Sequence, residues 1–209
     1  MIQQKSFNYK FNYNNDNELN FFVNKTNFYA FDALINNDTK CSFLYGPKKS
    51  GKSFLSEIWL KKNNAIKYKN NYELLLNLNN NILIDNLKFY DQEKIFYLVN
   101  NCILNNLKIL ITSDIKINAV DFKFNDLSSR LKTFSILEIN KPNDEMLLAV
   151  LTKLLVEKQF IIKSNEIFEY ILRRVDRSYQ GINEIVNKLD ILSLEKKRQL
   201  TIPLIKEIL

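Results

Sequence analysis

Hydrophobic residues follow two different patterns along the chain, and the change between them falls near residue 140. Before that point, short continuous apolar runs alternate with stretches of helical spacing, and the runs lie at residues 41–45, 82–84 and 109–111. Such runs are typical of parallel strands that are buried on both faces. A further strand is expected over residues 133–139, while residues 65–68 and 72–78 leave strand and short helix open. Strands alternating with helices predict an α/β fold with a doubly wound parallel sheet.

After residue 140 the sequence predicts only helices. Apolar residues at helical spacing form three stripes, which begin at Met146, Ile167 and Ile182. Thr201 is suited to cap a last short helix, and Pro203 is tolerated in the first turn of that helix. We therefore expect a flexible polar segment over residues 1–20, an α/β subdomain over residues 21–140 and a small all-helical lid subdomain over residues 141–209.

A phosphate-binding loop follows the first expected strand. Residues 46–53 read Gly-Pro-Lys-Lys-Ser-Gly-Lys-Ser and fit the pattern G-x-x-x-x-G-K-[ST] between a strand-like run and a helical stretch. This context argues against a chance loop, because strand, turn and helix together place backbone N–H groups around a phosphate. In such a loop Lys52 reaches the β- and γ-phosphates and the Ser53 hydroxyl binds Mg²⁺. The nucleotide-binding residues expected here are Gly46, Pro47, Lys48, Lys49, Ser50, Gly51, Lys52, Ser53 and Phe54.

Two later strands end in polar side chains. Asp85 closes the run at residues 82–84, and Thr112, Ser113 and Asp114 close the run at residues 109–111. The carboxyl ends of parallel strands form the ligand-binding edge of an open α/β sheet. We therefore expect Asp85 beside the loop, where its carboxylate and Ser53 can hold Mg²⁺.

Composition and charge narrow the range of functions. The chain has 209 residues, of which 46% are hydrophobic, and a net charge of +7, which favours acidic partners such as nucleotides or nucleic acid. The basic residues are scattered, however, and a solvated surface is the more usual meaning of that pattern. The absence of histidine excludes metal sites and catalytic triads built on it.

Other features of the sequence concern the cellular compartment. The isolated Cys41 and Cys102 are expected to be reduced core residues of a cytoplasmic protein. The first residues do not resemble a signal peptide, and no apolar run approaches membrane-spanning length. We therefore expect no membrane association.

The motifs together resemble the AAA+ ATPases, and in particular the ATPase region of DnaA-type replication initiators. This likeness is carried by Leu-Tyr-Gly-Pro at residues 44–47, Ile-Thr-Ser-Asp at residues 111–114 and Ser-Ser-Arg-Leu at residues 128–131. Residues 189–209, with Thr-Ile-Pro at 201–203 and Lys-Glu-Ile-Leu at 206–209, resemble the C-terminus of the Hda-type DnaA regulatory inactivators. The tail is the most specific part of a resemblance that covers nearly the whole chain after residue 20.

The resemblance implies an AAA+ P-loop sheet with a helical lid and a regulatory function. Hda-type proteins bind ADP, attach to the sliding clamp of DNA polymerase (its β subunit) and make DnaA hydrolyse its own ATP. The resemblance thus implies ADP or ATP with Mg²⁺ as cofactors, DnaA and the clamp as partners, and a cytoplasmic location at the replisome; it leaves a homodimer open. It implies roles for Arg130, as an arginine finger acting on the partner's nucleotide, and for Thr112, Ser113, Asp114, Arg177 and Gln180, as sensors of bound nucleotide.

Two positions depart from the family pattern within the nucleotide site. Asn86 follows Asp85 where ATP-hydrolysing relatives carry a second acid, and an amide cannot accept a proton from water at neutral pH. We therefore expect weak ATPase activity from this chain alone. Gln180 stands where a sensor arginine is expected, with Arg174 or Arg177 as open alternatives, and this change weakens recognition of the γ-phosphate most.

The N-terminal segment retains only part of a clamp-binding peptide. Gln4 and Phe7 match its glutamine and one apolar anchor, but Lys5 stands where an apolar residue is expected. Docking of this peptide into an apolar groove and a disordered polar tail are equally good interpretations.

Three functions compete on this basis. The leading hypothesis is a negative regulator of replication initiation that promotes ATP hydrolysis on DnaA. The alternative is a DnaA-like initiation or origin-targeting factor that acts through protein contacts and nonspecific DNA contacts. A small-molecule kinase is disfavoured by the Ser-Ser-Arg box and the tail. The chain ends before the helix-turn-helix domain of an initiator could begin, so we expect DNA contact to be indirect or nonspecific.

Overall fold

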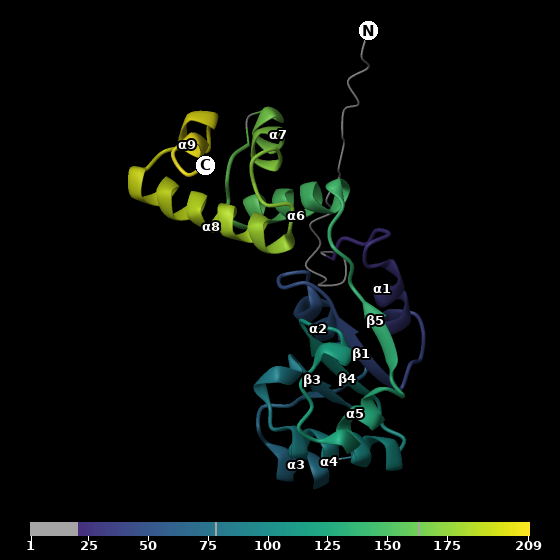
Figure 1. The fold of residues 1–209 in the computed structure, drawn as a ribbon. Coiled ribbons are helices and arrows are strands. Elements are labelled where there is room, and N and C mark those ends of the chain that lie inside the picture. The colour runs from purple at the N-terminus through teal and green to yellow at the C-terminus, as the bar shows by residue number, and fades with distance from the viewer. Residues whose placement is uncertain (1–20, 78, 163) are drawn as a thin grey trace.

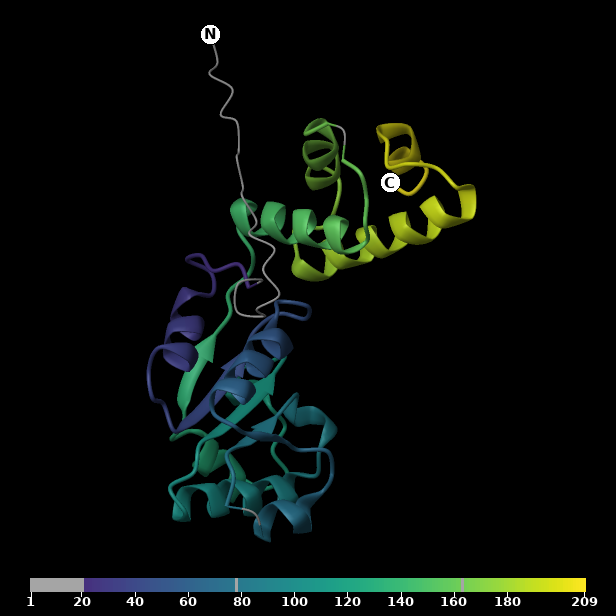
Figure 2. The same cartoon turned by 180° about the vertical axis from the view of Figure 1, so that it is seen from behind.

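The computed structural model describes residues 21–77, 79–162 and 164–209. In these residues an α/β part comes first, and a group of helices follows it (Figures 1 and 2). The expected clamp-binding residues Gln4 and Phe7, and the whole segment 1–20, lie outside the described residues. None of the helices that the structure describes has the length and apolar character needed to span a lipid bilayer.

Five parallel strands form the sheet of the α/β part. They are β1 (Cys41–Tyr45), β2 (Ile66–Lys67), β3 (Ile82–Ile84), β4 (Ile109–Ser113) and β5 (Ser135–Glu138), in the spatial order β2-β3-β4-β1-β5. Strand β4 lies between β3 and β1, so Ile111 pairs with Ile84 on one side and Phe43 on the other. The carboxyl ends of these three strands therefore meet at one edge of the sheet, where the phosphate loop also begins.

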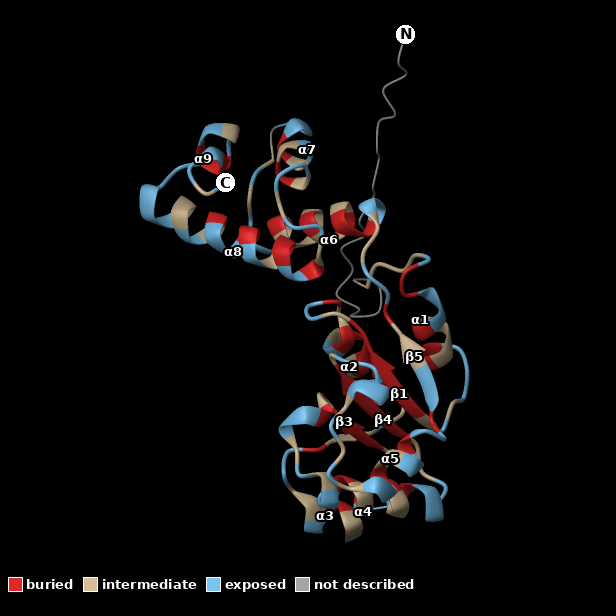
Figure 3. Cartoon of the chain, viewed as in Figure 1, coloured by how far each residue is buried: buried red, intermediate tan, exposed pale blue. Residues whose placement is uncertain are grey.

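Helices cover both faces of the sheet. Helices α1 (Phe28–Ile35) and α2 (Lys52–Lys62) pack on one face, whereas α3 (Tyr72–Asn77), α4 (Gln92–Leu104) and α5 (Asn125–Leu131) pack on the other. Side chains alternate between the faces along each strand, so Leu44 and Leu83 contact the first group and Phe43 and Ile84 contact the second. The central strands are buried from both sides (Figure 3). This arrangement confirms the expected doubly wound fold.

Two short 3₁₀ segments, η2 (Leu87–Phe89) and η3 (Ile117–Ala119), follow β3 and β4 respectively. The first places Lys88 and Phe89 directly after the carboxyl end of β3, close to the phosphate loop.

Four helices follow the sheet: α6 (Asp144–Glu157), α7 (Glu166–Leu172), α8 (Tyr179–Lys196) and α9 (Ile202–Lys206). They share an apolar core of their own, which includes Leu151, Ile171 and Leu189. The Thr201 side chain accepts a hydrogen bond from the backbone N–H of Leu204, which confirms the expected cap. The division into subdomains near residue 140 stays a prediction, although β5 ends at Glu138 and α6 begins at Asp144.

The helical group also contacts the α/β part. Met146 of α6 and Tyr179 of α8 are buried in the apolar cluster that contains α1 and α2, rather than in the core of the four helices. Packing between the two parts thus fixes where α6 and α8 lie relative to the phosphate loop.

The structure corrects two of the predictions made from the sequence and resolves a third that was left open. Cys102 is buried as expected, but Cys41 is only half-buried, because it is the first residue of β1 and lies at the end of the strand. The final strand is shorter than residues 133–139, and the exposure of Ser135 and Ile136 follows from the position of β5 at the sheet edge. The two ambiguous stretches are the edge strand β2 and the helix α3.

Candidate functional site

The phosphate loop runs from the end of β1 to the start of α2. Gly51 has a φ of 88° at the N-cap of α2, and Lys49 also lies in the left-handed region, with a φ of 63°. A Cβ atom on Gly51 would lie 3.0 Å from the ring of Phe21, and one on Gly46 would lie 2.7 Å from the carbonyl oxygen of Ile139. The loop therefore needs glycine at both positions, for backbone conformation at Gly51 and for space at Gly46.

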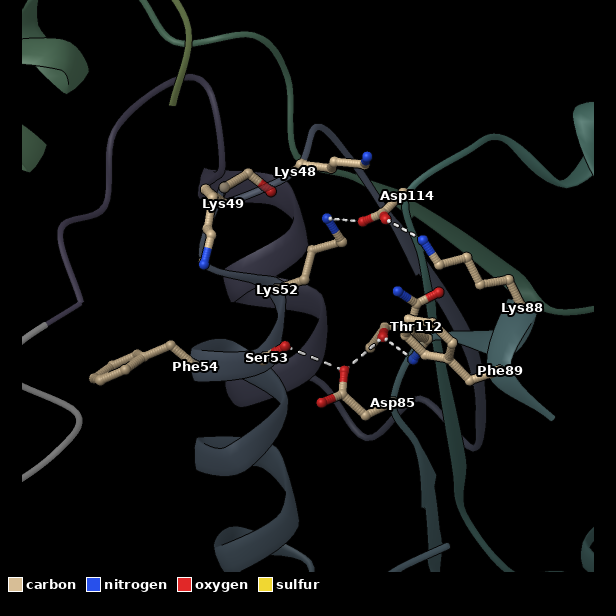
Figure 4. A pocket seen from close by; sticks show the side chains of 13 residues that line it. Lys48, Lys49, Lys52, Ser53, Phe54, Asp85, Lys88, Phe89, Thr112 and Asp114 are labelled. Atoms are coloured by element: carbon tan, nitrogen blue, oxygen red, sulfur yellow. Dashed lines mark hydrogen bonds and ion pairs between the residues drawn. The ribbon is translucent and has the colours of Figure 1, made fainter. Parts of the chain in front are cut away.

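Lys52 is held inside the loop. Its side chain is 8% exposed, and its Nζ donates to the carbonyl oxygens of Gly46 (2.9 Å) and Pro47 (2.7 Å). The same Nζ lies 3.1 Å from Oδ1 of Asp114, while Lys88 contacts the other oxygen of that carboxylate at 3.4 Å (Figure 4). A buried cation is thus held at the start of α2 by groups that a phosphate could replace.

The pKa values of this pair have opposing causes. Burial lowers the pKa of the Lys52 ammonium, and the nearby Asp114 only partly opposes that effect. Burial by itself raises the pKa of the Asp114 carboxyl, but Lys52 and Lys88 outweigh it and hold this pKa below its ordinary value. Asp114 is therefore ionised at neutral pH.

Asp85 is the centre of a second polar cluster. Its Oδ1 accepts hydrogen bonds from the hydroxyls of Ser53 (3.2 Å) and Thr112 (2.9 Å), as Figure 4 shows. The backbone N–H of Asn86 donates to the same Thr112 hydroxyl at 2.8 Å. The structure thus brings together the residues predicted from three separate stretches of sequence.

Lys67 is a member of this cluster that the sequence did not reveal. Its Nζ lies 2.9 Å from Oδ2 of Asp85 and 3.0 Å from Oε1 of Glu57 on α2. Burial alone lowers the pKa of the Lys67 ammonium, but the hydrogen bonds to Asp85 and Glu57 outweigh it and raise this pKa. The contact depends on the register of β2 against β3, and no local pattern in the sequence marks that register.

A cavity of about 550 Å³ lies between the phosphate loop and the polar residues that follow β3 and end β4. Its lining consists of residues 48–54 of the loop, with Asp85, Asn86, Lys88, Phe89, Thr112 and Asp114. Four of these side chains are lysines and two are carboxylates, so the lining has a net positive charge. The hydroxyl of Ser50 is buried and has no hydrogen-bond partner among the described residues. A cavity of this charge, with a polar atom left unpaired, suits an anionic ligand.

A second cavity, of about 290 Å³, shares the loop residues but is lined mainly by apolar groups. Phe21 stacks on Phe54 with ring centroids 5.8 Å apart, and the two parts of the chain meet here through Met146, Tyr179 and Asn183. Phe54 points away from the Asp85 cluster (Figure 4) and lines both cavities. This cavity could not be predicted from the sequence, because its walls come from three distant stretches of the chain. The aromatic pair at residues 21–22 is the one local signal of it.

The remaining predicted residues lie elsewhere. Ser113 is buried, and its hydroxyl accepts a hydrogen bond from the backbone N–H of Ile115. Arg177 pairs with Asp144 and lines a different, smaller cavity in the helical group. Gln180 donates to Glu184 at 2.7 Å along the exposed side of α8. Arg130 is exposed in the last turn of α5.

The other sensor candidate also has a local partner. The guanidinium of Arg174 lies 3.7 Å from the centre of the Tyr170 ring, one turn earlier in the chain. Like Arg177, it is therefore held by residues of the helical group.

A divalent metal would need ligands besides this chain. Among the residues that the structure describes, no group of three His, Cys, Asp or Glu side chains is close enough to hold a metal ion. Ser53 and Asp85 supply two oxygen donors on adjacent elements, which fits Mg²⁺ when phosphate oxygens and water complete its coordination.

Comparison with known proteins places these features in a family. The family model described as "Hda, lid domain" matches residues 144–209. An uncharacterised protein of Haemophilus influenzae is 30% identical over 217 residues, which cover 93% of this chain and 94% of that protein. The chromosomal replication initiator protein DnaA of Buchnera aphidicola is 29% identical over 158 residues, or 72% of this chain. The helical part of the chain thus matches the Hda lid family, and most of its length is related to DnaA.

The chain matches only 34% of the length of the Buchnera initiator. Domain III of DnaA from Thermotoga maritima has a TM-score of 0.77 at 18% identity, covering 91% of this chain and 93% of that one. DnaA of Aquifex aeolicus, solved with AMPPCP bound, has a TM-score of 0.67 at 18% identity, covering 86% and 66%. These likenesses confirm the expected AAA+ fold with its helical lid.

Proposed function

We propose that this chain is a nucleotide-bound regulator that lowers replication initiation by promoting ATP hydrolysis on DnaA. The observation that carries the proposal is the match of its lid to the Hda lid family. Two further features support a regulatory function: Asn86, rather than an acid, lines the phosphate cavity, and Arg130 is exposed to a partner.

The proposed ligand is ADP or ATP, bound across both cavities. The structure of the Aquifex relative with AMPPCP supports this class of ligand. Lys52 supplies a cation for the phosphates, and the loop supplies backbone N–H groups. The flat apolar surface of Phe21 and Phe54 in the second cavity suits the base. When bound, Mg²⁺ would neutralise phosphate charge, with Ser53 and Asp85 as its protein ligands.

The nucleotide site favours binding over hydrolysis by the chain itself. Asn86 lines the phosphate cavity, and its Oδ1 is buried without a hydrogen-bond partner among the described residues. This oxygen can orient a water molecule, but an amide cannot take up its proton. Slow turnover by the isolated chain follows from this chemistry.

Arg130 is proposed to act on the nucleotide of DnaA. It is exposed at the end of α5 and has no ion pair with any residue in the described part of the chain. A guanidinium supplied to a neighbour can stabilise the charge that develops on its γ-phosphate, an effect of about 10³–10⁵ in rate. The sliding clamp, bound through Gln4 and Phe7, is the proposed means of bringing the two proteins together.

The test is the rate of ATP turnover by DnaA in the presence of DNA-loaded clamp. Adding the chain should raise this rate, and Arg130→Ala should remove at least about 100-fold of the stimulation. ADP affinity should not change in this variant, and Lys132→Ala, which alters an exposed cation two residues away, should retain the stimulation. An unchanged rate on adding the wild-type chain would overturn the regulatory proposal.

The second candidate is an initiation factor that touches DNA through nonspecific contacts. The likeness to the Buchnera initiator and the net charge of +7 favour it. It predicts binding to duplex DNA with a steep dependence on salt, whereas retention only at very low salt would argue against it.

A further inference from the structure

Lys67 contacts Oδ2 of Asp85, whereas Ser53 and Thr112 donate to the other oxygen, Oδ1. Strand β2 pairs with β3 so that Lys67 is opposite Leu83, and the side chain of Asp85 follows two residues later on the same face. Helix α2 covers that face and adds Glu57. The result is a lysine between two carboxylates, 2.9 Å from Asp85 and 3.0 Å from Glu57.

Both oxygens of Asp85 already have partners. Oδ1 accepts from Ser53 and Thr112, and Oδ2 accepts from Lys67. The carboxylate is 16% exposed and the lysine 29%, so solvent only partly screens their attraction. The negative charge that would attract a divalent cation is therefore largely compensated by the chain itself.

We propose that Lys67 is a built-in counter-ion of Asp85, which lets this chain hold a nucleoside diphosphate with little dependence on Mg²⁺. A positive charge within 3 Å of a carboxylate reduces its attraction for a second cation, and Mg²⁺ gives up its water reluctantly. The β-phosphate can still be neutralised by Lys52 and by the neighbouring lysines of the loop. The inference rests on the proposed nucleotide binding and adds a residue that sets its metal requirement.

Glu57 competes with Asp85 for the positive charge of Lys67. Because Lys67 contacts both carboxylates, it can remain paired with Glu57 when Asp85 turns to Mg²⁺. Removing the charge of Glu57 should hold Lys67 more firmly at Asp85, and removing the charge of Lys67 should release Asp85 for the metal. The two changes are therefore expected to act in opposite directions.

The experiment measures the dissociation constant of ADP for the full chain by calorimetry, in millimolar MgCl₂ and in EDTA. The measured quantity is the ratio of the ADP dissociation constant in EDTA to that in MgCl₂, which should be below about threefold for the wild type. For Lys67→Met this ratio should be about tenfold higher, the effect of removing one nearby charge at a partly exposed site. Lys67→Arg should keep the wild-type ratio, and Glu57→Gln should lower the ratio toward unity. Lys69→Met, an exposed lysine two residues further along, is the matched control and should not alter the ratio.

The outcomes separate the two levels of inference. A folded Lys67→Met protein whose ratio equals the wild-type ratio would show a purely structural ion pair and overturn the counter-ion role. If Lys67→Met does not fold, the wild-type ratio decides the question: a value below about threefold supports the counter-ion role, and a larger value overturns it. Failure to bind ADP under either condition would overturn the proposed function itself, and this inference with it.

Discussion

Two regions of this protein are rich in cations, and they use them differently. Around the phosphate loop, Lys52 and Lys88 converge on Asp114 at the wall of a shared cavity. In the lid, Arg173 pairs with Glu169 one turn away and Arg177 pairs with Asp144 at the start of α6. The lysines of the loop line a cavity, whereas the arginines of the lid form ion pairs with carboxylates of the lid itself.

This difference indicates how the two parts would share a nucleotide. The lid contributes Met146 and Tyr179, both buried, to the second cavity. Its arginines lie with partners of their own. We therefore interpret the lid as an apolar cover for the base, and the loop as the source of the charge that meets the phosphates. A protein built in this way would distinguish the γ-phosphate poorly, which is compatible with a regulator that retains ADP.

Among the variants that test this difference between loop and lid, Lys52→Ala should lower ADP affinity most. It removes the buried cation of the loop, and a charge-assisted contact of about 2–3 kcal/mol corresponds to a loss of roughly 30- to 150-fold in ADP affinity. Calorimetric titration with ADP measures the change. Lys61→Ala, an exposed lysine in the last turn of α2, is the control and should bind ADP as the wild type does. Equal affinity in both variants would contradict the assignment of the loop as the phosphate site.

An intermediate effect is expected from Phe54→Ala. This ring lines both cavities and stacks on Phe21, so its loss should weaken ADP binding about three- to tenfold, the range of one aromatic stacking contact. Binding of inorganic pyrophosphate, which has no base, should change less. Phe28→Ala removes a half-exposed ring of α1 outside both cavities and serves as the control. A larger loss for pyrophosphate than for ADP would show that the base does not occupy the second cavity.

The smallest effect is expected from Arg177→Ala. The arginine pairs with Asp144 at the surface of the lid, so its removal should cost less than about 1 kcal/mol of stability and change ADP affinity by less than about twofold. Thermal unfolding and ADP titration give the two values, with Arg173→Ala as a matched control. A tenfold loss of ADP affinity in Arg177→Ala alone would mean that this side chain turns toward the phosphates when nucleotide binds, and the contrast between loop and lid would no longer hold.

The sequence by itself determined the features that depend on local spacing. The loop at residues 46–53, the acids that close β3 and β4, and the cap at Thr201 all lie where the sequence predicted them. Each is fixed by a few neighbouring residues and by the geometry of a strand or a helix, so a local pattern is enough to find it. The fold followed from the same patterns, because strands that alternate with helices have few ways to bury their apolar faces.

Only the tertiary structure decided which distant side chains meet. Lys67 reaches Asp85 because β2 pairs with β3 in one register, and a shift of one residue would turn it to the opposite face. Phe21 and Tyr179 line one cavity because the lid packs against α1 and α2, a contact between segments that are far apart in the chain. The pairing of Arg177 with Asp144 likewise depends on how the helices of the lid pack together. Register and packing are set by burial over the whole molecule, and no local pattern in the chain records them.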